Sequence, residues 1–129
     1  MDAGPGGTDT GMMLVNTTLY GFALGGAPTI AIGDTTGLWI LTVFQWDTLN
    51  YRSRVMAVGS ASNSGTWSSF YQNAGKSSDD TDHLSIGRSK AYGRYMNGSI
   101  DLVGVWSRML TDDEITELYN LGAGKDYPF

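Results

Sequence analysis

The stretch of sequence that decides the fold is LSIGRSKAYGRYMNGSIDLVGVWSRMLTDDEITELY, residues 84–119. Its first part contains short runs of β-branched and aromatic residues separated by glycines, a pattern that predicts strands at 84–86, 92–96 and 100–106. From residue 111 the apolar residues change to helical spacing, which predicts one helix over 111–121. This part of the chain is therefore predicted to be a series of strands closed by a single helix.

The predicted helix has clear signals at both ends. Thr111 is the expected N-cap, and Glu114 three residues later completes a capping box. Asp112 and Asp113 lie in the first turn, where carboxylates offset the helix dipole. Gly122 fits the position that stops a helix. The apolar side chains at helical spacing are Ile115, Leu118, Tyr119 and Leu121. We expect this helix to close one end of the β structure.

The rest of the chain is predicted to be strands joined by tight turns, at 12–15, 19–24, 29–32, 38–46, 51–58 and 66–71. Leu38–Trp46 is almost continuously apolar, which is typical of a central strand covered on both faces. Tyr51–Val58 is its expected antiparallel partner. Because Trp39 and Trp106 have apolar neighbours, we expect both in the core. The sequence thus predicts an all-β antiparallel sandwich with one short C-terminal cap helix.

Length and charge limit the other possibilities. A chain of 129 residues fits one domain, which we divide into a flexible arm (1–10), the sandwich (11–122) and a tail (123–129). The net charge of −5 argues against nucleic acid as a partner, because phosphate binding needs a basic surface. The chain has no cysteine for disulfides, no apolar run long enough for a membrane helix, and no signal-peptide pattern at its start.

Four segments, in the right order, resemble the laminin-G-like jelly roll of the concanavalin A-like class. They are GLWILTVFQWD (37–47), RVMAVG (54–59), LSIG (84–87) and GSIDLVGVWSRML (98–110) followed by the helix. The resemblance implies a two-sheet jelly roll used mainly for binding and assembly. Asp101 is followed by Leu102, where the family often has a second acidic residue, so a metal site of the family is not carried over to this position.

The sequence does not predict an enzyme. Hydrolysis of a glycosidic bond uses two carboxylates that flank the bond, whereas the two glutamates, Glu114 and Glu117, both lie on the predicted helix. The single histidine, His83, has no serine near it in a nucleophile pattern.

Exposed aromatic residues near polar loops are the best candidates for ligand binding: Trp67, Tyr71, Tyr92, Arg94 and Tyr95. The tryptophans are also candidates for a platform on which sugars stack. The alternative interpretation is a solvated sheet edge that resists strand pairing. Asp79, Asp80 and Asp82 form the densest acidic cluster, and carboxylates on a loop are typical calcium ligands. A solvated loop without metal is the alternative.

Two functions follow as hypotheses. The first is a non-enzymatic structural or assembly module, such as a surface component of a phage virion, since laminin-G-like domains of phage proteins resemble this chain in lacking cysteines. Its partners would be further copies of the chain or capsid and tail proteins, and its location the virion or a cell surface. The second is a carbohydrate-binding module that recognises glycans through exposed aromatic side chains, with calcium as an optional cofactor. We expect no other cofactor.

Overall fold

The computed structural model describes residues 11–22, 27–47, 49–72, 86–89 and 93–125, and most of its regular structure is β. One antiparallel sheet contains β1 (Gly11–Val15), β2 (Thr18–Phe22) and β3 (Thr29–Ala31). The larger sheet contains β4 (Leu41–Asp47), β5 (Arg52–Val58), β6 (Thr66–Trp67) and β7 (Tyr71–Gln72). A small ribbon pairs β8 (Arg88–Ser89) with β9 (Arg94–Tyr95), and α1 (Asp112–Tyr119) runs into a 3₁₀ turn, η1 (Asn120–Gly122).

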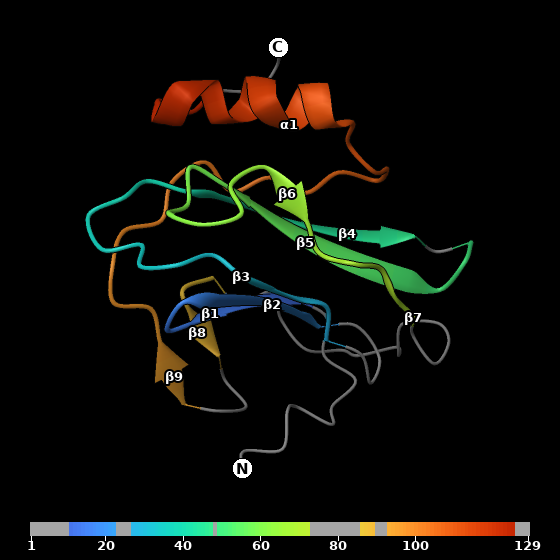
Figure 1. Cartoon of the computed structure of the whole chain (residues 1–129), viewed down its shortest axis with the longest axis horizontal. Coiled ribbons are helices and arrows are strands. Elements are labelled where there is room, and N and C mark those ends of the chain that lie inside the picture. Colours follow the sequence, from blue (N-terminus) through green and yellow to red (C-terminus); the bar gives the residue numbers. More distant parts are fainter. Residues whose placement is uncertain (1–10, 23–26, 48, 73–85, 90–92, 126–129) are drawn as a thin grey trace.

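The two larger sheets share a buried interior (Figure 1). Leu19 of β2 and Ile32 after β3 pack against Val55 and Ala57 of β5, and all four are essentially buried. Phe44 of β4 packs against the same cluster. Because side chains alternate along a strand, these residues of β4 and β5 occupy one face of the larger sheet and leave the other face for a different partner.

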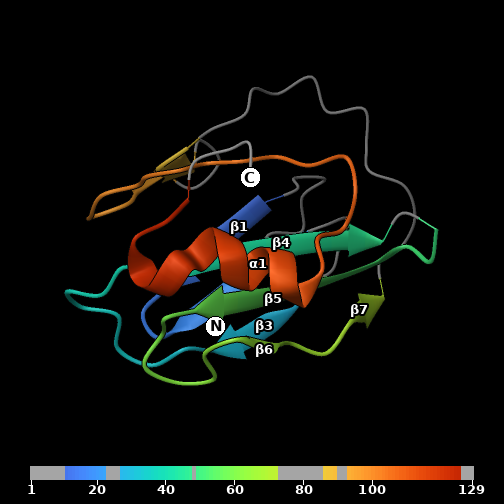
Figure 2. The ribbon, with the colours of Figure 1, turned by 90° about the horizontal axis from the view of Figure 1, so that it is seen from above.

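That other face is covered by α1, which lies across β4 and β5 when seen from above (Figure 2). Met56, Leu110 and Ile115 form a second buried cluster. Half-buried residues complete it: Leu41, Val43, Val58, Trp67, Trp106 and Leu118. The expectation that the helix closes an end of the structure was therefore wrong. β4 and β5 are apolar on both faces, so the helix is needed on a face of the sheet.

The cap of α1 is confirmed at its start and corrected at its end. The Thr111 side chain accepts from the Glu114 backbone, and the Glu114 side chain accepts from the Thr111 backbone, which makes the predicted capping box. The helix ends at Tyr119, before Gly122, because Asn120 takes the left-handed conformation (φ 45°). Asparagine tolerates this conformation better than most residues do.

The strand predictions are confirmed for most of the first half of the chain and differ from the structure at four places. The strand expected from Leu38 begins only at Leu41, because a turn in which Leu38 N–H donates to Thr35 precedes it. Trp39 consequently lies outside the core with 58% of its surface exposed, while Trp106 is half-buried.

The strand expected at 66–71 consists of two short pieces, β6 and β7, and residues 100–106 form no strand. β8 lies where a loop was expected. Residues 1–10, 84–85 and 126–129 are outside the described part, so the predicted arm, the first residues of the 84–86 strand and the last four residues of the tail stay predictions. Among the described residues, no helix has the length and apolar character that crossing a bilayer needs.

Gly21 sets how closely the two sheets approach. A Cβ atom at this position would lie 2.6 Å from Cγ1 of Val55 and 2.7 Å from Cδ2 of Phe44. We expect Gly21→Ala to lower the free energy of unfolding by about 1–3 kcal/mol, because the sheets must separate or the core must repack. Urea unfolding followed by tryptophan fluorescence measures this change. Gly11→Ala is the matched control, since no atom lies within 4 Å of its Cβ position, and equal losses in the two variants would contradict the account.

Candidate functional site

A cavity of about 330 Å³ lies between the start of β4, the segment 101–106 and the C-terminal end of α1. Its lining combines aromatic, aliphatic and charged side chains with exposed backbone: Trp39, Ile40, Leu41, Asp101, Leu102, Trp106, Leu118, Tyr119, Gly122, Ala123, Gly124 and Lys125. This volume falls at the lower end of the range for small-molecule sites, which are mostly apolar with a few polar groups that orient the ligand.

Three glycines allow the walls of the cavity to close around it. Gly104 lies against the ring of Trp106, Gly59 against the hydroxyl of Tyr119, and Gly124 against the side chain of Leu102. A Cβ atom on any of these glycines would overlap the side chain beside it. Each of the three side chains therefore packs directly on the backbone of a glycine. A larger residue at the glycine would push that side chain away.

The polar groups of the cavity are held in defined positions. Oδ1 of Asp101 accepts from the backbone N–H of Leu102 at 2.8 Å. Lys125 forms an ion pair with Glu117 of α1. Leu102 takes a positive φ of 51°, which is costly for a residue with a branched side chain. Such strain is typically kept only where the surroundings fix the backbone, and it often occurs at ligand sites.

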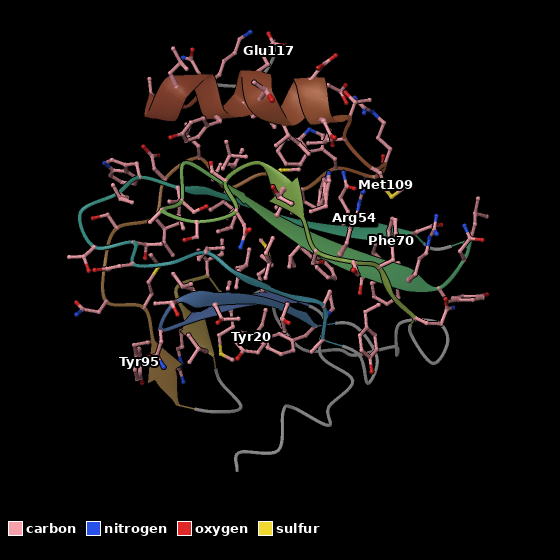
Figure 3. All side chains as sticks on the ribbon, in the orientation of Figure 1. Tyr20, Arg54, Phe70, Tyr95, Met109 and Glu117 are labelled. Carbon is pink, nitrogen blue, oxygen red and sulfur yellow. The ribbon has the colours of Figure 1, made fainter. Side chains whose placement is uncertain are left out.

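A second group of polar and aromatic residues lies on the same face of the larger sheet, beyond the N-terminal end of α1. The Arg54 guanidinium lies over the Trp67 ring (3.9 Å to the centroid), and both Arg52 and Arg54 lie over Phe70 (4.0 and 4.7 Å). Figure 3 shows Arg54 beside Phe70, with Met109 near them. Nε1 of Trp67 donates to Oδ1 of Asp112 at 2.8 Å. This stack ties β5, Trp67 of β6 and Phe70, which directly precedes β7, to the helix start.

The buried amide of Gln45 joins this stack to the rest of the fold. Oε1 of Gln45 accepts from Nε and Nη2 of Arg54 (3.1 and 3.0 Å), and Nε2 donates to the carbonyl of Leu110 at 2.6 Å. Burial lowers the pKa of Arg54 from its usual value, and the nearby Asp112 carboxylate opposes that shift.

Of the predicted ligand residues, the structure describes the side chains of Trp67, Tyr71 and Tyr95, and it does not bring these three together. Trp67 is half-buried beneath Arg54, and Tyr71 on β7 is 43% exposed. Tyr95 is 73% exposed, and its ring lies 5.8 Å from the Arg88 guanidinium. Figure 3 places Tyr95 and Phe70, which neighbours Tyr71 in sequence, at opposite ends of the molecule. Tyr92 and the side chain of Arg94 are outside the described part, so their predicted roles stay predictions.

The predicted calcium ligands Asp79, Asp80 and Asp82 are also outside the described residues, as is His83. Within the part that the structure describes, no three His, Cys, Asp or Glu side chains are grouped as a metal site would require.

Sequence reasoning missed the cavity because its walls come from distant parts of the chain. The apolar neighbours of Trp39 predict a core position for it, and the helical spacing predicts only that Tyr119 lies on the apolar face of the helix. Gly37, two residues before Trp39, has a positive φ of 73° and belongs to the turn that precedes β4. This glycine, directly before the apolar run, is the local signal that the strand begins after Leu38.

Comparisons of the chain with models of protein families, with curated proteins and with solved structures find no match.

Two carboxylates outside the cavity have strongly lowered pKa values. Asp47, at the end of β4, has a pKa of about 2, chiefly because Nδ2 of Asn50 donates to it at 2.7 Å, with help from Arg52. Glu114 also has a pKa of about 2, chiefly because Arg108 donates to both of its oxygens. Both groups hold their negative charge more strongly in the folded state than in an unfolded chain.

These shifts predict acid sensitivity with a defined sign. An unfolded Asp or Glu titrates at roughly 4, so the stabilisation is complete above that pH and is lost as the pH falls towards the folded values near 2. Urea unfolding at a series of pH values measures the slope. Asn50→Ala keeps the Asp47 carboxylate but removes its main hydrogen-bond donor. In this variant the free energy of unfolding should fall less steeply as the pH is lowered from about 4 towards about 2. An unchanged slope in this variant would show that the hydrogen bond does not shift the pKa of Asp47.

Proposed function

We propose that this protein is a non-enzymatic structural module that self-associates and forms part of a larger surface assembly such as a virion. We also propose that its fold is a laminin-G-like jelly roll. Two antiparallel sheets with a common interior, followed by a single C-terminal helix, support the proposed fold. The order of the resembling sequence segments supports it as well.

The observation that supports this function is the lack of strand pairing and the exposed side chains of the segment Ile100–Trp106. Apart from the bond from Leu102 N–H to Asp101, its backbone makes no hydrogen bond among the described residues. Val103 is 55% exposed and Val105 is 83% exposed. Unpaired backbone next to exposed β-branched side chains is what an edge strand offers to another chain.

A second copy of the same segment is the partner that this edge fits best. Two copies related by a two-fold axis would pair the segment with itself in an antiparallel ladder, so one patch serves both sides of the interface. Such pairing would satisfy the backbone groups and cover Val103 and Val105 in one step. Capsid or tail proteins with a free strand would be bound by the same chemistry.

The absence of catalysis belongs to the same proposal. Glu114 is fully engaged in the capping box and the Arg108 pair, and Glu117 pairs with Lys125. Both glutamates support structure on α1 through these bonds.

Carbohydrate binding is the second candidate function, because one observation favours it. Trp39, a large aromatic side chain with 58% of its surface exposed, borders the cavity beside α1. An exposed tryptophan at the mouth of a cavity is typical of a binding site.

Self-association is tested by light scattering on a size-exclusion column over a range of concentrations. The natural chain should form a dimer or a larger closed oligomer, and Val105→Lys should weaken association by about tenfold or more, because the charge must be desolvated in the ladder. Leu49→Lys is the matched control, since Leu49 is 88% exposed on the β4–β5 connection. A natural chain that stays monomeric at every concentration would overturn the proposal.

A further inference from the structure

We propose that the cavity between Trp39 and the C-terminal end of α1 is a saccharide site that holds one or two sugar rings. The inference rests on carbohydrate binding, the second candidate function, and it moves that function away from Trp67, Tyr71 and Tyr95. The ligand is a terminal sugar unit of a glycan, because a cavity of about 330 Å³ has no room for a long polymer.

The first argument is the chemistry of the lining. A pyranose has an apolar face of C–H groups and an edge of hydroxyls, so it needs an aromatic ring beside polar acceptors and donors. The residues that line the cavity include the aromatic Trp39 and two charged residues, Asp101 and Lys125. The Lys125 ammonium group pairs with Glu117 and Asp101 accepts from the Leu102 N–H, so both polar groups are already oriented at the cavity.

The second argument is the exposure of Trp39. Packing accounts for Trp106, which is half-buried against the second core cluster, but not for Trp39, which keeps 58% of its surface in contact with solvent. A tryptophan at the rim can stack on a ligand without prior rearrangement. Burial of the Trp39 ring by a ligand would therefore contribute free energy to binding, because folding leaves most of this ring exposed.

The third argument is that the site is preformed. Glycines at positions 59, 104 and 124 let Tyr119, Trp106 and Leu102 pack directly on backbone, so the walls have little freedom to collapse into the cavity. Asp101 is fixed at the same time by its bond from the Leu102 N–H. A site that is already ordered loses less conformational entropy when a ligand binds.

The saccharide site and the proposed assembly edge use different residues of one segment. Leu102 and Trp106 line the cavity, whereas Val103 and Val105 do not. Each function can therefore be removed without the other, and failure of one proposal leaves the other testable.

The test is a glycan array with and without calcium, followed by calorimetric titration of the chain with the terminal mono- or disaccharide of any glycan that binds. Binding is expected, and Trp39→Ala should weaken it by about tenfold or more. Trp39→Phe should recover part of the affinity, because the ring is kept. Since Trp39 is mostly exposed, these variants should fold normally, and their oligomeric state should equal that of the natural chain.

Tyr95→Ala is the matched control, because Tyr95 is an exposed aromatic residue that does not line the cavity. It should bind as the natural chain does. A glycan that binds Trp39→Ala as well as the natural chain would overturn the cavity as its site while leaving carbohydrate binding in place. Loss of binding in Tyr95→Ala alone would assign the glycan to the Arg88–Tyr95 surface instead. If no saccharide binds under either condition, both the site and carbohydrate binding are refuted.

Discussion

The fold depends on the buried side chain of Gln45, which links three parts of the chain that are far apart in sequence. Only 4% of Gln45 is exposed. Its amide accepts from Arg54 on β5 and donates to the carbonyl of Leu110, the residue directly before the N-cap of α1. An unsatisfied buried amide costs free energy. The bonds of Gln45 therefore fix the position of Leu110 against β4, and with it the start of α1.

The position of the helix explains both proposed functions. With its start fixed above Gln45, α1 places Ile115 and Leu118 over the apolar half of the outer face, and its C-terminal end lies beside Trp39. The segment before it reaches Leu110 alongside β4 without forming a ladder. The space beside this segment is the cavity, and the segment itself, whose backbone is not part of a ladder with any other described strand, is the proposed assembly edge.

Local chemistry made much of the fold predictable from sequence. The capping box needs only Thr111 and Glu114, and the β4–β5 pair follows from two neighbouring apolar runs. Trp39 and residues 100–106 could not be placed, because their environment depends on contacts with distant residues. The same holds for the cavity, whose walls pack on glycines up to 60 residues away from them in sequence (Gly59 and Tyr119). The jelly-roll topology and the predicted acidic loop stay predictions.

Hydrogen–deuterium exchange of the amides at 100–106 tests the central claim most directly, because it reports whether this backbone is paired. At concentrations where light scattering shows a monomer, these amides should exchange rapidly, and at concentrations where the chain associates they should become protected. The amides of β5, which is paired on both sides, should be protected throughout. Strong protection of residues 100–106 in the dilute monomer would mean that the segment is already paired within its own chain, and the account of assembly would be contradicted.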